Sequence, residues 1–414
     1  MKYKVFWCKV NKYYTDEWLN SKYLEDKSGI FIASCVVTDN AKKKWIKFVK
    51  QEIPQLQEKD KIYISWCGAF EEGQENKDFF KIYPDLEIFK EKIEVLGEKP
   101  KEEKKPKLDT SKFNSIKTKL NLTTKKFLLI QWGCDSFCTF CLTVIKRGRH
   151  FYRSAEDIVD EIIEFEMQGG KEVVLTGVNL WAWGQENTNQ FIDSKLWDLL
   201  EYILEKTEIQ RIRISSLGPE FVDEKVLKIF ENKRIYPHFH YSIQSGSSPV
   251  LKAMRRHYDG EYMRDLLQKT LNVKREDGVK VSIWADLIVW FPGESEENFL
   301  DTLDLVKNYN ITKVHAFPFS NHTLWEHVPA SFFPHQIDEK IKKQRLDLLI
   351  ATWEKVREDF ITSQVGNTFE VLIENVKDGQ FKWWTQNYIE ATNDNFEIIS
   401  GEIKKNEIIT WKLK

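Results

Sequence analysis

The sequence predicts an α/β chain with three parts: an N-terminal βαβ open-sheet domain, a central partial (β/α)6 barrel and a small C-terminal β-barrel. Short apolar strands alternate with helical patterns over residues 1–95, and six further strand–helix pairs follow within residues 121–363. Residues 364–414 carry only short β-type patterns. Strands that alternate with helices are typical of parallel sheets. The charged stretch 96–120, with Pro100 and Pro106, is expected to be a linker.

The composition is that of a globular protein without membrane spans. Of the 414 residues, 42% are hydrophobic and 30% are charged, and no apolar run approaches the roughly 18 residues of a membrane span. The N-terminus lacks the apolar core and cleavage site of a signal peptide, so we expect a cytoplasmic protein whose thiols stay reduced. The net charge of −2 gives no general signal for nucleic-acid binding, so such a surface must be a local basic patch.

A cysteine follows each strand that we expect in the N-terminal domain. The strands are Tyr3–Phe6, Gly29–Ser34 and Lys61–Ser65, with helices around Thr15–Asp26 and Ala41–Gln51, and the N-terminal cysteine set is Cys8, Cys35 and Cys67. Because the carboxyl ends of parallel strands share one edge of a sheet, these distant cysteines should meet there. A single buried cysteine is commonly just part of a core. The shared position of three predicts a cluster site, which we interpret as an iron–sulfur cluster with one open iron.

The central cysteine set is Cys134, Cys138 and Cys141, in the spacing C-x3-C-x2-C after the apolar run Phe127–Ile130. Thiolates hold iron–sulfur clusters, and with no fourth cysteine nearby one iron of a cubane would lack a protein ligand. Zinc and a purely structural role are the alternatives, although zinc sites favour four ligands. The spacing resembles that of the radical S-adenosylmethionine enzymes. This resemblance implies that the open iron binds S-adenosylmethionine and that the reduced cluster cleaves it to a radical.

Small and polar residues follow the strands of the predicted barrel, at the edge where such folds bind ligands. The expected strands are Phe127–Ile130, Glu172–Thr176, Arg211–Ser215, His238–Gln244, Val281–Val289 and Lys313–Phe319. The expected helices are Ala155–Met167, Lys195–Glu205, Asp223–Asn232, Glu261–Arg275 and Glu296–Asn308, with a long helix over Ile337–Ser363 closing the domain. The candidate cofactor-binding residues are Gly177, Asn179, Ser215, Ser216, Gln244 and Ser245.

The last fifty residues mix cations and aromatic side chains on short strands. The strand patterns are Thr368–Glu374, Phe381–Ala391 and Glu397–Leu413. Lys382 and Tyr388 are the candidate RNA-binding residues here, because single-stranded RNA bases stack on aromatic side chains beside basic groups. A plain structural β module is the alternative.

The two cysteine sets, the barrel pattern and the C-terminal β domain together resemble the methylthiotransferases, over essentially the whole chain. The last fifty residues resemble the TRAM RNA-binding module of that family. Cys8–Asn11, Leu175–Leu180 and Arg213–Ser216 resemble the MtaB branch, which methylthiolates threonylcarbamoyladenosine beside the tRNA anticodon. The alternatives are the branches that act on isopentenyladenosine in tRNA or on a ribosomal-protein aspartate, and a non-catalytic iron–sulfur RNA-binding paralogue.

The resemblance implies two 4Fe-4S clusters with different roles. The central set would hold the cluster that generates the radical, which removes hydrogen from an adenine C–H bond. The N-terminal set would hold the cluster that carries the methylated sulfur, which the carbon radical captures. The implied partners are tRNA, S-adenosylmethionine and an electron donor such as flavodoxin or ferredoxin, with no membrane. Arg147, Arg149 and Arg153 match a basic family motif and are assigned to tRNA phosphate contacts, with a solvated charged face as the alternative.

Tryptophan stands at several positions where the family has glycine: Trp7, Trp66, Trp132, Trp181, Trp284, Trp290, Trp325 and Trp383. Glycine is used where the backbone approaches a cofactor closely or takes a positive φ, so an indole there should clash, yet the flanking residues still match. Our hypothesis is that the source organism reads UGA as glycine and that these positions are recoded glycines. The competing interpretation is a diverged paralogue, in which cluster binding at Cys8 and Cys67 would be the first function in doubt.

Overall fold

The computed structural model describes residues 1–6, 9–36, 38–69, 79–97, 124–186, 195–322, 327–335, 339–374, 376 and 382–414. Trp7, Cys8, Trp325 and most of the predicted linker lie outside the described residues, as does the side chain of Lys382. The chain forms two compact units. The first unit is Met1–Lys117, Trp132–Phe151 and Ser320–Phe332, and the second unit is Thr118–Gln131, Tyr152–Phe319 and Phe333–Lys414.

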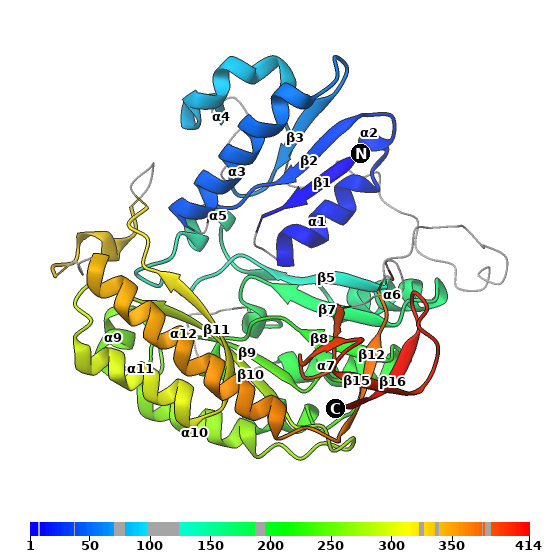
Figure 1. The fold of residues 1–414 in the computed structure, drawn as a ribbon. Helices are drawn as coiled ribbons and strands as arrows, with labels where there is room; N and C mark the ends of the chain where they lie inside the picture. The colour runs from blue at the N-terminus through cyan, green and yellow to red at the C-terminus, as the bar shows by residue number, and fades with distance from the viewer. Residues whose placement is uncertain are drawn as a thin grey trace. The chain divides into compact units, whose positions relative to one another are not determined.

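The first unit contains a parallel four-stranded sheet in the order β1-β2-β3-β4 (Figure 1). Its strands are β1 (Lys2–Val5), β2 (Gly29–Ala33), β3 (Lys61–Ser65) and β4 (Ile93–Val95). Its helices are α1 (Lys9–Leu19), α2 (Lys22–Glu25), α3 (Asp39–Glu52), α4 (Phe79–Ile82) and a 3-10 helix over Pro84–Lys92. The apolar residues of β2 and β3 pack against α3 around the fully buried Trp45. The predicted parallel sheet is therefore confirmed, with β4 as an added strand.

One predicted helix of the first unit is divided in the structure. Instead of one helix over Thr15–Asp26, α1 begins earlier and ends at Leu19, and α2 is a separate short helix. Between them Ser21 is extended, with φ −80° and ψ 145°, and its hydroxyl donates to the carbonyl of Trp18 at 2.6 Å. A short polar side chain that bonds to nearby backbone competes with helix hydrogen bonds, which explains the break.

The second unit contains six parallel strands that follow one another in chain order (Figure 1). They are β5 (Lys125–Trp132), β7 (Glu172–Gly177), β8 (Arg211–Ile214), β9 (His238–Gln244), β10 (Ser282–Val289) and β11 (Ile311–Pro318). β5, β7 and β8 form one sheet, which the two-residue β6 (Phe151–Tyr152) extends, and β9, β10 and β11 form another. A parallel bridge between Leu217 and Tyr241 links the chain after β8 to β9. The α/β class with parallel sheets is confirmed.

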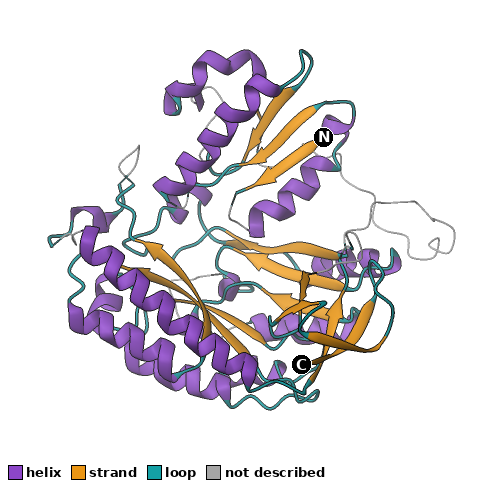
Figure 2. Ribbon diagram, in the orientation of Figure 1, coloured by secondary structure: helices purple, strands orange, loops and turns teal. Residues whose placement is uncertain are grey.

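Helices cover one face of these strands (Figure 2). They are α6 (Ala155–Met167), α7 (Leu196–Lys206), α8 (Glu224–Ile229), α9 (Ser248–Ala253), α10 (Gly260–Leu271), α11 (Glu296–Asn308) and α12 (Glu339–Thr362). Alternate strand residues such as Leu175, Tyr241 and Ala285 join the helices in one apolar core. Since successive side chains of a strand point to opposite faces, the residues between them lie on the face that the helices leave open.

Helix caps explain which bounds were predictable. α11 begins where predicted because Ser295 and Asn298 form a capping box, and Ser154 caps α6 by accepting from the N–H of Asp157. α8 and α10 end three and four residues earlier than predicted, at Ile229 and Leu271. Among the described residues, no helix is both long and apolar enough to span a membrane.

The C-terminal strands are short and antiparallel. β12 (Thr368–Leu372), β16 (Ile408–Leu413) and β15 (Phe396–Ser400) form one sheet, and β13 (Lys382–Trp384) pairs with β14 (Glu390–Thr392). The predicted strand Phe381–Ala391 is thus two strands, joined by a turn in which Tyr388 has φ 60°. The C-terminal strands have a small core of their own, which contains Phe369, Ile409 and Trp411 together with Phe360 of α12.

A buried carboxylate on β7 yields a first prediction, on stability. Glu172 accepts hydrogen bonds from Arg213 (2.5 Å) and Tyr236 (2.6 Å), and Arg211 lies at 3.4 Å. Burial alone would raise the pKa of Glu172, but the two arginines lower it to about 2. Replacing Glu172 with glutamine should reduce the free energy of unfolding at pH 7 by about 3–5 kcal/mol, because it leaves buried arginines without their counter-charge.

The contribution of Glu172 to the free energy of unfolding decreases as the pH falls. The folded pKa of Glu172 is lowered, so its stabilising effect is complete above the unfolded value of about 4.3 and is lost as the pH falls toward about 2. Urea unfolding at pH 7 and at pH 3 should therefore show a smaller difference between wild type and Glu172→Gln at the lower pH. Glu205→Gln, at an exposed pair with Lys206, is the control and should change neither curve. Equal differences at both pH values would contradict the prediction.

Candidate active site

The central cysteine set lies in the first unit, in the loop between β5 and α5 (Thr143–Arg147). Burial raises the pKa of the Cys134 thiol to about 11, and its hydrogen bonds with Ser136 oppose the rise. The thiols of Cys141 and Cys138 raise it further. That the three sulfurs bind one cluster stays a prediction from the spacing of the cysteines.

Backbone N–H groups already point at two of these sulfurs. The N–H of Ser136 lies 3.5 Å from Cys134 Sγ, and the N–H of Thr143 lies 3.4 Å from Cys141 Sγ. Hydrogen bonds to the sulfurs tune iron–sulfur clusters, so the donor set fits a thiolate-bound cluster. Gly133, with φ 69°, is required beside it, because a Cβ there would lie 1.9 Å from the carbonyl oxygen of Arg149.

Two members of the N-terminal set occupy equivalent positions on neighbouring strands. β2 and β3 are paired in parallel with Ala33 opposite Ser65, and Cys35 and Cys67 each come two residues later. Both are buried, and Cys67 Sγ accepts a hydrogen bond from Arg147 Nε at 3.2 Å. Cys8 follows the end of β1 by three residues in the sequence and lies outside the described residues.

Two of the eight tryptophans that stand where the family has glycine have backbone conformations that favour glycine. Trp66 has φ 82° and Trp290 has φ 80°, and both are buried. A bulky residue in this left-handed region is a genuine outlier. The indole N–H of each is also buried without a hydrogen-bond partner among the described residues. Around Trp66 the rings of Tyr14 and Trp132 lie 4.0 and 5.1 Å away, so aromatic rings fill the space next to Cys67.

The three arginines assigned to RNA differ in exposure. Arg147 is buried, and besides Cys67 it contacts the ring of Trp132 at 5.2 Å, which does not favour a phosphate contact. Arg153 donates to Glu161 at 2.8 Å and to the carbonyl of Leu129 at 3.1 Å, so it ties β5 to α6. Arg149 pairs with Asp135 at 2.9 Å, yet its side chain is 63% exposed. Of these three, Arg149 presents its guanidinium to solvent.

Gln131, which the sequence analysis did not single out as a site residue, organises the end of β7. Its side-chain Oε1 accepts from the backbone N–H groups of Val178 and Asn179, at 3.0 and 2.7 Å. A Cβ on Gly177 would lie 3.0 Å from the same side chain and 2.8 Å from Leu180. Gly177 and Asn179 therefore belong to a tightly held turn, and the only sequence signal for Gln131 was its place at the end of the strand before the cysteines.

Two hydroxyls on the open face of the strands have no hydrogen-bond partner among the described residues. They are Thr176 Oγ1 at the end of β7 and Ser215 Oγ just after β8, both fully or nearly fully buried. A buried polar group without a partner is costly, so both are suited to bind a polar ligand. Ser216 follows at a half-buried position.

The other candidate residues have structural partners. Ser245 Oγ lies 3.3 Å from the hydroxyl of Thr302 on α11, and Gln244 is a buried residue with φ 72° at the end of β9. Tyr388 packs against His238 (4.1 Å between ring centroids) and beneath the guanidinium of Arg213 (4.4 Å). These contacts place Tyr388 against β8 and β9, a role that its sequence context did not indicate.

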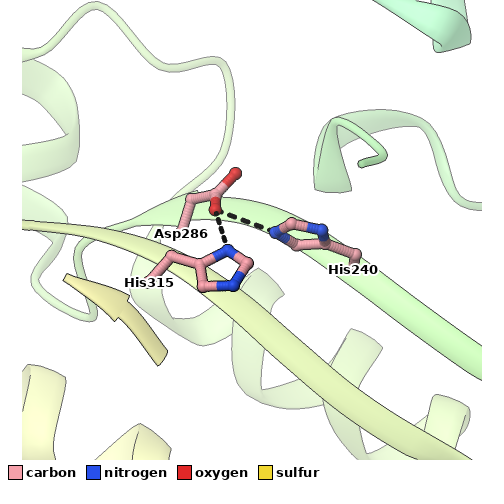
Figure 3. A group of neighbouring side chains, drawn as sticks. All are labelled: His240, Asp286 and His315. Carbon is pink, nitrogen blue, oxygen red and sulfur yellow. Dashed lines mark hydrogen bonds and ion pairs between the residues drawn. The ribbon is translucent and has the colours of Figure 1, made fainter. Parts of the chain in front are cut away.

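A cluster of polar side chains, which the sequence analysis missed, lies on the open face of β9, β10 and β11 (Figure 3). Asp286 Oδ1 lies 2.8 Å from His240 Nε2 and 3.2 Å from His315 Nδ1. Asp286 stands directly opposite His315 in the parallel register. The sequence did carry a signal for this cluster, because polar residues stand at alternate positions within three apolar strands. That signal is weaker than the closely spaced cysteines, and the prediction followed the cysteines.

Comparison with known proteins shows the family of this chain. The model of the radical SAM superfamily matches residues 128–306. A threonylcarbamoyladenosine tRNA methylthiotransferase, MtaB of Bacillus subtilis, is 29% identical over 97% of this chain and 92% of its own. A tRNA-2-methylthio-N(6)-dimethylallyladenosine synthase of Clostridium perfringens is 31% identical over 84% of this chain and 79% of its own.

Among solved structures, the radical S-adenosylmethionine methyltransferase TsrM of Kitasatospora setae has a TM-score of 0.47 at 12% identity, covering 73% of this chain and 67% of that chain. The family assignment rests on the curated relatives and on the matched superfamily model. The chain belongs to the tRNA methylthiotransferase family of radical S-adenosylmethionine enzymes.

Proposed function

We propose that this methylthiotransferase acts on threonylcarbamoyladenosine beside the anticodon of tRNA. The observation that carries the proposal is the match to the Bacillus subtilis MtaB over almost the whole of both chains. The second candidate substrate is dimethylallyladenosine, because the Clostridium perfringens relative is slightly more identical over a smaller part of the chain. The polar groups on the open face of the strands favour the first, since a dimethylallyl group is apolar and would leave them unpaired.

Some residues of the chain would hold the cluster, and others would position the molecules that react. Cys134, Cys138 and Cys141 would hold a 4Fe-4S cluster, which when bound to S-adenosylmethionine supplies the one-electron reduction that cleaves it. The buried hydroxyls of Thr176 and Ser215, which have no hydrogen-bond partner among the described residues, would bind polar groups of a ligand in the second unit. The protein's own task is to hold the reacting groups within bonding distance and to exclude water.

The N-terminal set would hold a second cluster. Its support is the matched placement of Cys35 and Cys67 at the ends of paired strands, with Cys8 as the third ligand. The hydrogen bond from Arg147 to Cys67 Sγ supplies a cation beside one ligand. This favours the charged thiolate form in which cysteine binds iron. In this assignment Arg147 is a positioning residue of the second cluster and not an RNA contact.

The remaining assignments concern domains and partners. We assign residues 1–95 to the methylthiotransferase domain, 121–363 to the radical domain and 364–414 to a TRAM-like RNA-binding domain, with 96–120 as the linker. The exposed Arg149 would contact phosphate, and Lys382 would contact RNA. An electron donor such as flavodoxin or ferredoxin would reduce the clusters in the cytoplasm.

Nucleoside analysis tests the substrate. A strain without the gene should lack the methylthio mass on threonylcarbamoyladenosine in its digested tRNA, and the wild-type gene should restore it, as measured by mass spectrometry. A Cys138→Ala gene is the control and should not restore it. Loss of the methylthio group from dimethylallyladenosine instead would establish the second candidate, and an unchanged tRNA profile would overturn both.

A further inference from the structure

His240, Asp286 and His315 form a hydrogen-bond network whose most exposed member is His315. Asp286 Oδ1 accepts from both histidines, and its second oxygen accepts from Ser242 Oγ at 3.4 Å. Figure 3 shows the second nitrogen of His315 on the side of its ring away from Asp286. The His315 side chain is 34% exposed, whereas those of Asp286 and His240 are 18% and 8% exposed. His315 is therefore the member that a ligand can reach.

Asp286 fixes the orientation of His315. Burial alone would raise the pKa of the Asp286 carboxyl, but His240 and His315 hold it well below its usual range. An ionised carboxylate bonded to Nδ1 requires a proton on that nitrogen and leaves Nε2 facing away. An imidazolium donates from both ring nitrogens, so a ligand carboxylate at Nε2 would be bound by the ring that Asp286 orients.

The surroundings add a cation to the same face. Lys313 lies two residues before His315 on β11 and so points to the same side. The ligand atoms of His240, Asp286 and His315 all lie within 4.8 Å of one another, so a divalent cation is the alternative occupant that the test must distinguish.

We propose that His315, oriented by Asp286 and His240, binds the carboxylate of the threonylcarbamoyl group and so selects this nucleoside over its apolar counterpart. The inference rests on the proposed function, because that substrate carries the carboxylate. A charged hydrogen bond is about twice as strong as a neutral one. A site built to make it rejects an analogue that cannot, because its own polar groups are then left unpaired.

The test uses the full-length reconstituted protein and two anticodon stem-loop RNAs, one with threonylcarbamoyladenosine and one with its methyl ester. Equilibrium binding is measured by fluorescence anisotropy without reductant, and KM and kcat with it. Wild type should prefer the acid over the ester by about tenfold or more. His315→Gln should reduce this preference to about twofold or less while leaving ester binding unchanged, and the loss should fall on KM rather than kcat.

Two further variants make the outcome decisive. Asp286→Asn should also lose the preference, because it frees the His315 ring, whereas His327→Gln, at an exposed histidine, should keep it. A preference retained in both His315→Gln and Asp286→Asn would overturn the inference while the proposed function stands. A wild type that binds acid and ester equally and methylthiolates only dimethylallyladenosine would show that the proposed function itself is wrong. Stoichiometric non-iron metal, lost in His315→Gln, would overturn the carboxylate assignment.

Discussion

A chain made with glycine at the eight doubtful positions is expected to bind about eight irons after anaerobic reconstitution, against about half or fewer with tryptophan. The positions are Trp7, Trp66, Trp132, Trp181, Trp284, Trp290, Trp325 and Trp383. The physical reason is clearest at Trp66, the residue before Cys67, whose ring packs in a group with those of Tyr14 and Trp132 where the family has glycine. Iron analysis and visible absorption measure the difference. Equal iron content in the two chains would contradict the prediction.

The stability of single variants separates recoded positions from genuine tryptophans. Removing a buried indole costs about 3–5 kcal/mol. At Trp66 and Trp290 glycine also relieves a positive φ, worth about 1–3 kcal/mol, and removes an unpaired buried N–H, worth about 1–3 kcal/mol. The terms nearly cancel, so Trp66→Gly and Trp290→Gly should each change the free energy of unfolding by about 2 kcal/mol or less.

Trp45 supplies the matched control. It is fully buried against Tyr83 and Phe79 on a regular helix, and its indole N–H is likewise buried without a hydrogen-bond partner among the described residues. Trp45→Gly relieves no positive φ and adds the cost of about 1 kcal/mol for glycine in a helix interior, so it should lose about 3 kcal/mol or more. The gene gives an independent measurement: UGA codons at the eight positions and UGG at Trp18, Trp45, Trp183 and Trp197 are the expected pattern. UGG codons scattered among the eight, or a Trp66→Gly loss as large as that of Trp45→Gly, would favour the diverged paralogue.

Much of the fold was predictable because local signals agreed with the packing. α6, α11 and β9 have the predicted bounds, since caps or strong apolar alternation mark their ends. α5, β4 and α9 were missed because each is too short to show a periodic pattern of its own. The break at Ser21 was missed because it depends on a side-chain bond to the backbone that composition does not reveal.

Candidate site residues that lie close together in the sequence could be predicted. Those that are distant in the sequence and are brought together only by the pairing of strands were missed. The central cysteines lie within eight residues, so their spacing alone predicted a shared cluster site, and that stays a prediction. His240, Asp286 and His315 are separated by dozens of residues, and their proximity follows only from the register of three strands. Arg147 shows the opposite error, because its neighbours in sequence suggested an RNA surface, whereas folding buries it against Cys67.

In the chain made with glycine at the eight positions, the two cysteine sets should lose different activities when one ligand is removed. Cys138→Ala should retain about four irons but release no deoxyadenosine after reduction and transfer no methylthio group. Cys35→Ala should also retain about four irons, yet it should still release deoxyadenosine on reduction while transferring no methylthio group. Iron content, deoxyadenosine release and tRNA nucleoside mass, measured on the same preparation, separate the two patterns.

In the same glycine-containing chain, Ser136→Ala is the control for disturbance of the cysteine loop. It removes the hydroxyl 3.4 Å from Cys134 Sγ while leaving every thiol and the backbone N–H of residue 136 in place, so it should keep about eight irons and both activities. If Cys35→Ala also kept about eight irons, Cys35 and Cys67 would be ordinary core residues at the end of the sheet. If it instead lost deoxyadenosine release, the roles of the two sets would not be separable, because the radical would then depend on both.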